Sequence, residues 1–263
     1  MSIQIGNQQP QYVPVPIQAN DGASSRTGGP TNPYQDGFSP RKAAKAVLSD
    51  RQKKIEVLKF KILEIAKKNT QLSGCGCEAQ EVVKQLQPMV DELKSYYPYK
   101  TVEQELPQLA RTWKEVFSSD CEPEPPGFKT NRDHSYQTIF PDGQFINQAE
   151  LIGPLGVKVT GMLRAKYETK GNEIFLEFDK VTARPGGFRK KESLTELADK
   201  SRKGDLIQFD VSFGKVAPEG PVEAKGRIKN VYLDDDIRIA VGSNLADGVQ
   251  DLYILTPANL PEK

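Results

Sequence analysis

The chain has 263 residues, of which 37% are apolar and 27% charged, which is enough for one large domain with appendages. The net charge of +1 argues against a nucleic-acid-binding protein driven by overall charge. No run of about 18 apolar residues occurs, so we expect no transmembrane helix. Three cysteines, an odd number, do not form a disulfide framework and favour a reducing compartment.

Residues 1–40 are rich in Gln, Pro, Gly, Asn and Ser and contain few large apolar side chains. Such a segment cannot bury enough apolar surface to offset the entropy lost on ordering, so it is predicted to be a disordered tail. It lacks the basic start and apolar stretch of a secretory signal, and also the Arg-rich amphipathic pattern of many transit peptides.

Residues 41–111 are predicted to be helical. In 41–69, apolar residues recur at three- and four-residue steps, and the other faces are basic. A second helix is expected over 78–95, kinked or split at Pro88, and a third over 101–111. The basic face of the first helix, with Lys53, Lys54 and Lys61, is predicted to contact a membrane or a partner protein.

From Thr112 the apolar period changes from that of a helix to that of a strand. Strands are predicted at 112–118, 134–140, 144–152, 157–169, 173–184, 205–214, 222–233, 237–241 and 251–256. Tight turns are expected at 141–143 and 170–172, and a short helix capped by Ser193 over 193–200. This pattern predicts an α+β fold in which amino-terminal helices precede an antiparallel, lipocalin-like β-barrel over 112–257, followed by a tail at 258–263.

The acidic run, the neighbouring cysteines and the single histidine are the candidates for a chemical role. The run Asp234–Asp236 fits a charged turn in which Asp234 or Asp236 pairs with Arg238, a carboxylate at the barrel mouth, or a metal site, although an EF-hand pattern is absent. Cys75 and Cys77 are interpreted as free thiols, and His134 as a strand residue without a catalytic role. We therefore predict no catalytic residues, no metal and no cofactor.

Three stretches of the carboxy-terminal half resemble the plastid lipid-associated proteins, also called fibrillins or plastoglobulins. They are Tyr136–Ile139 with the downstream Asn147, Tyr232–Ile239, and the last apolar strand, Leu252–Leu255; Trp113 also stands where that family opens its first barrel strand. The chain departs from the family pattern around Trp113 and has a longer connection after Ile239. The resemblance implies a lipocalin-like barrel that binds lipid-like or quinone-like molecules at thylakoids or lipid globules.

Strand alternation and the resemblance together predict the positions that contact a ligand. The side chains expected in the barrel interior and mouth are Trp113, Phe117, Tyr136, Asn147, Phe175, Phe209, Phe213, Tyr232, Asp234, Asp236, Arg238 and Tyr253. Those apolar side chains could equally fill a solid core. The loop residues Arg189, Lys190 and Lys191 could touch anionic lipid head groups.

The leading hypothesis is non-enzymatic binding of a lipid, quinone or isoprenoid-like molecule by a peripheral protein of plastid thylakoids or their cyanobacterial equivalent. A second is a structural or assembly subunit whose tail and basic helix bind a larger thylakoid membrane protein complex. An enzyme acting on a lipid-like substrate ranks last, because the sequence offers no credible acid–base set.

Overall fold

The computed structural model describes residues 48–74, 76–120, 127–188, 193–210, 225–244 and 250–258, with the backbone alone at 208–210 and 244. These residues form four α-helices, two short 3₁₀-helices and nine strands of one antiparallel sheet. The predicted α+β class is thereby confirmed. The tail predicted at 1–40 lies outside the described residues, as does the tail predicted at 258–263 except for its first residue.

The first two helices form an antiparallel pair. Helix α1 (Asp50–Lys68) starts at Ser49, whose side chain and that of Gln52 make a reciprocal capping box. A 3₁₀ turn, η1 (Thr70–Leu72), and a short connection lead into α2 (Cys77–Ser95). The helix is not split at Pro88: α2 continues through this exposed proline.

Two shorter helices complete the helical part. Helix α3 (Val102–Leu109) is shorter than the predicted 101–111, because the backbone turns away from helical geometry at Ala110. Helix α4 (Leu194–Lys203) is capped by Ser193, as expected, but runs three residues past the predicted end. It stops at Gly204, whose φ of 82° is the left-handed conformation that glycine adopts without strain.

The strands follow the predicted order with shifted ends. They are β1 (Thr112–Ser118), β2 (Lys129–Phe140), β3 (Gln144–Ile152), β4 (Lys158–Lys170), β5 (Glu173–Pro185), β6 (Gln208–Asp210), β7 (Lys225–Leu233), β8 (Arg238–Asn244) and β9 (Gln250–Pro257); the second 3₁₀ turn, η2 (Pro154–Gly156), joins β3 to β4. Strand β2 starts well before His134, since its first residues still pair with β3 beyond an irregularity in register between Asn131 and Ser135.

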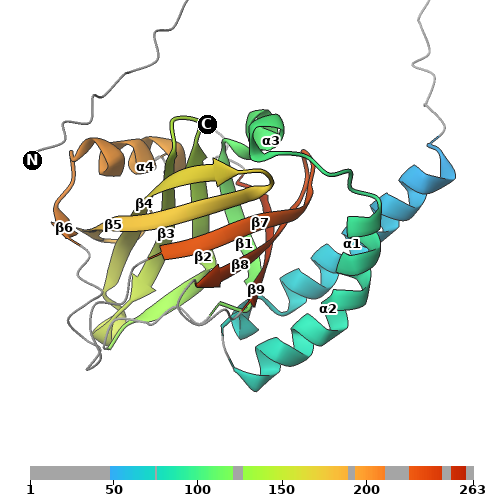
Figure 1. Ribbon diagram of the computed structural model, residues 1–263. Helices are drawn as coiled ribbons and strands as arrows, with labels where there is room; N and C mark the ends of the chain where they lie inside the picture. Colours follow the sequence, from blue (N-terminus) through green and yellow to red (C-terminus); the bar gives the residue numbers. More distant parts are fainter. Residues whose placement is uncertain are drawn as a thin grey trace, which may run out of the picture. The chain divides into compact units, whose positions relative to one another are not determined.

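The pairings between strands return to their starting point. The order is β4-β3-β2-β1-β9-β8-β7-β5-β6, and β4 also pairs with β5, so eight strands form a closed ring and β6 lies beside β5 (Figure 1). The β4–β5 hairpin is the longest pairing, from Thr160–Arg184 to Lys170–Glu173. Strand β1 joins β2 through three residue pairs. We call the side of the sheet enclosed by this ring the inner face.

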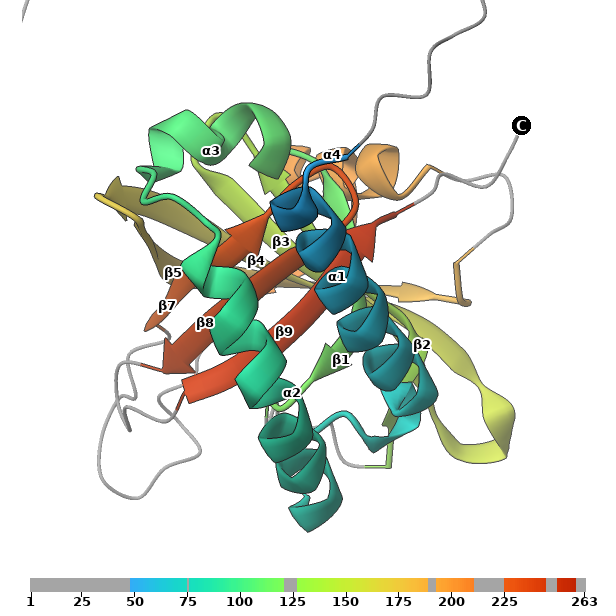
Figure 2. The ribbon, with the colours of Figure 1, turned by 90° about the vertical axis from the view of Figure 1, so that its right-hand side faces the viewer.

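Two apolar cores lie on opposite sides of the sheet. Helices α1 and α2 lie across the outer face of β7, β8, β9 and β1 (Figure 2), where Leu86 and Ile62 pack against Ile239 and Ile254. The inner face has its own core, built around Trp113, Phe145 and Ile174. Full burial of each such side chain stabilises the fold by about 1.5–3 kcal/mol.

Helices α3 and α4 cover further parts of the ring of strands. Helix α3 packs on one end of the ring, where the Trp113 indole N–H donates to the Leu109 carbonyl at 2.9 Å. Helix α4 packs on the outer side of β3 and β4, placing Leu197 against Ile146 and Met162. One end of the inner face is thus covered by a helix.

Candidate ligand-binding site

The most unusual group on the inner face is the guanidinium of Arg238, which is 0% exposed. Arg238 opens β8 and pairs with Leu233 and Leu255, two members of the inner core. Its Nε donates to Asn230 Oδ1 and its Nη1 to Gln137 Oε1, both at 2.9 Å. Three strands therefore position this cation.

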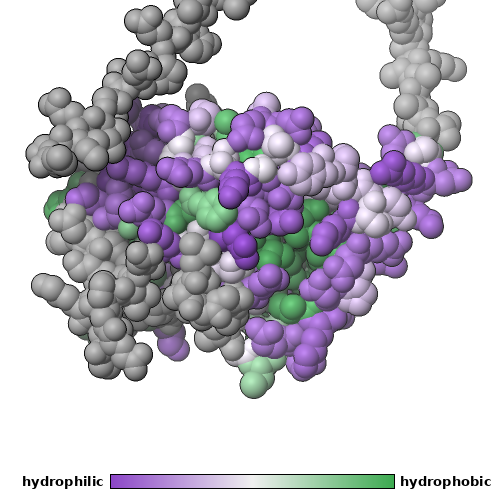
Figure 3. All heavy atoms as spheres, in the orientation of Figure 1, coloured by the Kyte–Doolittle hydropathy of each residue, from purple (hydrophilic) through white to green (hydrophobic). Residues whose placement is uncertain are grey.

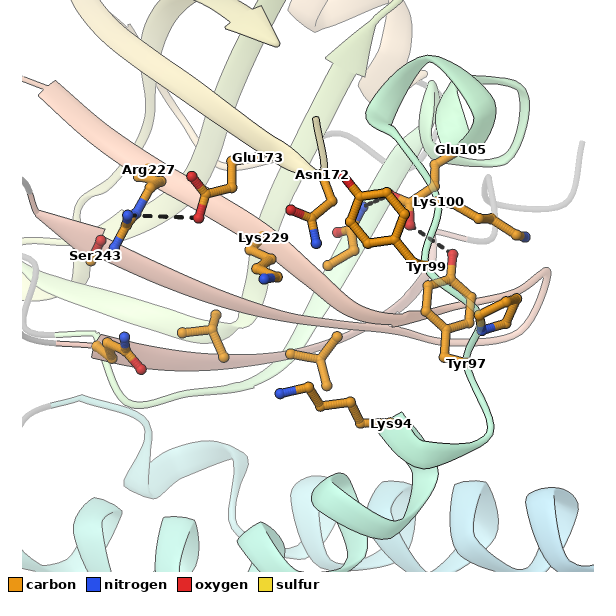
Figure 4. A pocket seen from close by; sticks show the side chains of 15 residues that line it. Lys94, Tyr97, Tyr99, Lys100, Glu105, Asn172, Glu173, Arg227, Lys229 and Ser243 are labelled. Carbon is orange, nitrogen blue, oxygen red and sulfur yellow. Dashed lines mark hydrogen bonds and ion pairs between the residues drawn. The ribbon is translucent and has the colours of Figure 1, made fainter. Parts of the chain in front are cut away.

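The hydrogen bonds continue from Arg238 to α3. Asn230 donates through Nδ2 to Glu105 Oε2 at 2.5 Å, and the Tyr97 hydroxyl donates to Glu105 Oε1 at 2.7 Å (Figure 4). Burial and the Glu105 carboxylate raise the pKa of Tyr97 above its ordinary value, so the hydroxyl keeps its proton. Glu105 is thus a buried acid that reaches Arg238 through Asn230, without a direct ion pair between the two side chains.

One nitrogen of Arg238 has no hydrogen-bond partner among the described residues: Nη2 is buried and makes no hydrogen bond. Burial lowers the pKa of Arg238 to about 10, so the group stays charged at neutral pH. An unsatisfied N–H of a buried cation costs more than about 1–3 kcal/mol, and such groups are commonly explained by an additional ligand or water. The Nη2 atom is a donor available to an oxygen-bearing group.

The inner face changes character beside Arg238. Phe145 on β3 and Ala165 on β4 are fully buried on this face. Because side chains alternate along a strand, the residues two and four positions from each of them point to the same face. The next row, Asn147, Leu163 and Val181, is half-buried. The row after that consists of small residues, Ala149, Gly161 and Ala183, and is half-buried as well.

The burial pattern gives the inner face two unlike ends. The end beneath α3 is packed by large side chains, whereas the end lined by Ala149, Gly161 and Ala183 is accessible to solvent. Gln137, which binds Arg238, pairs directly with Asn147 in the intermediate row. A molecule entering from the accessible end would meet apolar side chains first and the Arg238 region next.

Four of the side chains predicted to contact a ligand lie on the inner face. Trp113 is fully buried there, Arg238 is the buried cation, and Asn147 occupies the intermediate row. Tyr253 packs against the inner core and donates its hydroxyl to Asp120 at 2.6 Å. Its ring occupies the space beside Gly242, where a Cβ would come within 2.7 Å of Tyr253 Cε2.

Four others lie on the outer face instead. Phe117 and Tyr232 belong to the core beneath α1 and α2, because register irregularities in β1 and β7 turn them outward. Tyr136 packs edge-on against Phe188, and Phe175 points outward because its neighbour Leu176 occupies the inner core. These four are corrected to packing residues outside the ring.

The predicted pairing of Asp234 or Asp236 with Arg238 is wrong. Lys59 of α1 contacts both carboxylates, with Nζ–Oδ2 distances of 2.8 Å to Asp234 and 2.9 Å to Asp236. The other oxygen of Asp234 accepts from the backbone N–H groups of Asp236 and Ile237. Asp234 and Asp236 therefore form a turn that holds α1 on the sheet.

The remaining predicted residues divide between exposed positions and undescribed ones. Lys53, Lys54 and Lys61 are exposed on α1. The side chain of Phe209, and residues Phe213, Arg189, Lys190 and Lys191, lie outside what the structure describes, as do Cys75 and Cys121. Cys77 is an exposed free thiol, and His134 lies beside Glu150, with Nδ1 and Oε1 3.4 Å apart.

Sequence reasoning missed Glu105, Asn230 and Gln137. A signal existed for Glu105: it lies between Val102 and Leu109 on the face of α3 that is otherwise apolar. Gln137 lies within Tyr136–Ile139, one of the stretches that resemble the plastid lipid-associated proteins. Asn230 gave no comparable signal, since polar residues in strands usually face solvent. Their role follows only from the strand order.

The described part of the chain contains neither a candidate metal-binding cluster nor a helix that could cross a membrane. No cluster of three or more His, Cys, Asp or Glu side chains there could hold a metal ion. Nor does any helix among those residues combine the length and apolar composition that crossing a membrane requires. Comparison with models of known protein families and with curated proteins finds no match to this chain.

Proposed function

We propose that this protein binds a hydrophobic small molecule with a polar head, of the lipid, quinone or isoprenoid class, and catalyses no reaction. The closed ring of strands would be a lipocalin-like barrel that receives this molecule at its accessible end. The observation that carries the proposal is the buried, charged guanidinium of Arg238, whose Nη2 is unsatisfied, beside the half-buried row of Asn147, Leu163 and Val181.

Barrels of about eight strands either fill their interior with side chains or enclose one small ligand. Here the end under α3 is filled by large side chains, whereas the row of Ala149, Gly161 and Ala183 consists of small residues, with the Leu151 side chain next to Gly161. A ligand placed there would bury apolar surface at about 25 cal/mol per Å² before the costs of binding. A hydrogen bond from Arg238 Nη2 to an oxygen of its head would add about 1.5–3 kcal/mol.

The resemblance to the plastid lipid-associated proteins supports this class of ligand and a peripheral position at plastid thylakoids, lipid globules or their cyanobacterial equivalent. The residues that carry the resemblance include Arg238 itself, within the stretch from Tyr232 to Ile239. The location belongs to the proposal and rests on those motifs.

Binding measurements on two variants and one matched control test the proposal. The full chain should bind cis-parinaric acid and decyl-plastoquinone with micromolar affinity. Arg238→Gln keeps hydrogen-bonding capacity but removes the charge, and should weaken binding about tenfold or more. Ala183→Phe places a ring in the accessible end and should abolish binding. Lys166→Phe adds the same ring on the outer face of β4, where Lys166 is exposed, and should bind normally.

The outcomes separate clearly. Equal loss of binding in Ala183→Phe and Lys166→Phe would mean that the accessible end is not the site. Wild-type affinity in a folded Arg238→Gln variant would remove the guanidinium from the proposal. If neither probe binds the wild-type chain, and solvent extraction of the purified protein recovers no lipid or quinone, the proposed function fails.

A second candidate, docking of α1 on a larger thylakoid membrane protein complex, is favoured by one observation. Val57 and Phe60 are 51% and 68% exposed on the solvent side of α1, next to the exposed Lys53 and Lys61. The opposite side of α1 already packs on the sheet through Leu58 and Ile62. Apolar side chains among lysines on an outer helix face are typical of a contact surface.

This candidate has its own test. The double variant Val57→Ser/Phe60→Ser should bind isolated thylakoid membranes at least fivefold more weakly than the wild type. Glu64→Ser and Lys68→Ser on the same helix form the matched control. Unchanged binding of the double variant would contradict the docking role and would not affect the ligand-binding proposal.

A further inference from the structure

A groove of about 440 Å³ lies on the outer side of the sheet, away from the inner face (Figure 4). It is bounded by β7 and β8, by the turn between β4 and β5, and by the segment that joins α2 to α3. Figure 3 shows apolar side chains at the bottom of a hollow between the helices and the sheet, surrounded by hydrophilic residues. Its volume falls within the range of small-molecule sites.

The groove has an apolar floor and an aromatic wall. Val231 of β7 and Val241 of β8 form the floor, and both contact the core beneath α1 and α2. Tyr97 and Tyr99 stand on the joining segment (Figure 4), with the Tyr97 hydroxyl fixed by Glu105. Val231, Val241 and Tyr97 are held by neighbouring structure, whereas Tyr99 is largely exposed, so the floor and part of the wall are formed before any ligand arrives.

The charges around the groove do not balance. Lys94 extends from the end of α2 and Lys229 stands on β7 near the middle of the groove (Figure 4); neither has an ion-pair partner among the described residues. Arg227 lies 3.6 Å from Glu173, which accounts for one acid. The other acid, Glu105, already accepts from Tyr97 and Asn230. A third lysine of the lining, Lys100, lies over the Tyr97 ring, with its Nζ 5.2 Å from the ring centroid. Lys94 and Lys229 are therefore the lysines left to attract a negative group.

We propose that this groove binds an amphiphilic organic anion, namely a single-chain carboxylate such as a medium-chain fatty acid. Its chain would lie on Val231 and Val241 against Tyr97, and its carboxylate would be held by Lys94 and Lys229. The lysine ammonium group is a compact point charge that can pair with a carboxylate without demanding one orientation. This site is separate from the inner face and stands whether or not the barrel binds a ligand.

The two sites nevertheless touch through shared residues. Glu105 and Asn230 line the groove and also belong to the hydrogen-bond network that reaches Arg238. A carboxylate in the groove lies on one side of this network and the Arg238 Nη2 on the other. The test must therefore locate the ligand as well as measure its affinity.

Methyl NMR of the full chain with decanoate, kept below its micelle concentration, provides that location. Decanoate should shift the methyl signals of Val231 and Val241, and 1-decanol should not match its affinity. The double variant Lys94→Gln/Lys229→Gln should weaken decanoate binding about tenfold. Binding by the wild type should also fall as salt rises, because the charges are near the surface.

A matched control loses the same charge elsewhere. Lys84→Gln/Lys166→Gln removes one exposed lysine from α2 and one from a strand, and should leave the affinity unchanged. The groove proposal is overturned if this control weakens binding as much as Lys94→Gln/Lys229→Gln does, or if decanol binds as tightly as decanoate. It is also overturned if shifts occur at Leu163 and Val181 of the inner face but not at Val231 and Val241.

Two further arms distinguish related outcomes. Vesicles containing phosphatidylglycerol present anionic heads in a bilayer; binding to them without binding to monomeric decanoate would overturn a fatty-acid site. Arg238→Gln should leave the Val231 and Val241 shifts in place while weakening the inner-face probe. Failure of the groove and failure of the proposed function would therefore be seen separately.

Discussion

At the scale of single residues, Lys59 shows how a charge can fasten one layer to another. Its side chain is 5% exposed and contacts Asp234, Asp236 and Glu56 within 3.1 Å. Burial lowers the pKa of Lys59, but the hydrogen bonds to these three carboxylates outweigh it and leave the pKa above its ordinary value. The lysine is therefore charged at neutral pH.

Replacing Lys59 should cost more than replacing an exposed lysine of the same helix. Lys59→Met keeps the length of the side chain but leaves Asp234 without its cation. We expect the free energy of unfolding to fall by about 2 kcal/mol, less than for a fully buried pair because Asp236 is exposed. Urea denaturation measures it. Lys53→Met, which breaks only an exposed pair with Asp50, should change stability by less than about 0.5 kcal/mol; similar losses in both would contradict this role.

Asp234 makes the free energy of unfolding depend on pH in the acid range. Burial raises the pKa of Asp234, but Lys59 and two backbone N–H groups outweigh it, so the folded-state pKa lies below the unfolded value. The stabilisation is therefore present above the unfolded pKa of about 3.9 and is lost as the pH falls through the folded value.

We accordingly expect the free energy of unfolding to fall below about pH 4, and to fall less steeply in Asp234→Asn. Urea titrations at a series of pH values provide the measurement, and the difference between variants removes the contribution of other acids. Asp235→Asn, at an exposed neighbouring position, should keep the wild-type slope. Parallel curves for wild type and Asp234→Asn would rule out this linkage.

At the scale of elements, α2 shows that local propensity can lose to packing. Pro88 lacks an N–H and predicts a break, yet the helix continues from Cys77 to Ser95. The reason is that Leu86, Val90 and Leu93, on both sides of the proline, are buried against the same core. Burial of several apolar side chains exceeds the cost of one proline within a helix, about 3 kcal/mol.

Pro88→Ala should therefore stabilise the protein, by about 1–3 kcal/mol, because it restores a helical hydrogen bond at an exposed position. Thermal and urea unfolding would show it. Gln85→Ala, at another exposed position of α2, should change stability by only a few tenths of a kcal/mol. A destabilised Pro88→Ala variant would indicate that the proline fixes a bend required by the packing.

At the scale of the whole molecule, the sheet carries an apolar core on each of its two faces. Ile62 and Leu86 of the helices pack directly on Ile239 and Ile254 of the sheet, and Trp113 lies on the opposite, inner face. Because each apolar face needs the other for its burial, we expect the described part of the chain to unfold as one cooperative unit.

Two optical signals can check that expectation. Trp113 is the chain's one tryptophan, so its fluorescence reports on the inner face, while far-UV circular dichroism reports largely on the helices. Their urea transitions should coincide for the wild type. A fluorescence transition that follows the circular dichroism transition at higher urea would show that the ring of strands folds without α1 and α2.

The sequence by itself determined features that depend on near neighbours. Period-two alternation located the strands, Ser193 marked the start of α4, and the residues at 141–143 and 170–172 marked two hairpins. The class of fold followed from the same local signals. The expectation that Arg238 matters also came from the sequence, through the resemblance of Tyr232–Ile239 to a stretch of the plastid lipid-associated proteins.

Only the tertiary structure decided which partners these residues have. Lys59 meets Asp236 across 177 positions, and Arg238 meets Gln137 across 101, because strand order and ring closure bring distant segments together. Register irregularities in β1 and β7 turned Phe117 and Tyr232 outward, which alternation alone predicted the other way. Contacts of this kind depend on the path of the whole chain, so residue spacing cannot specify them.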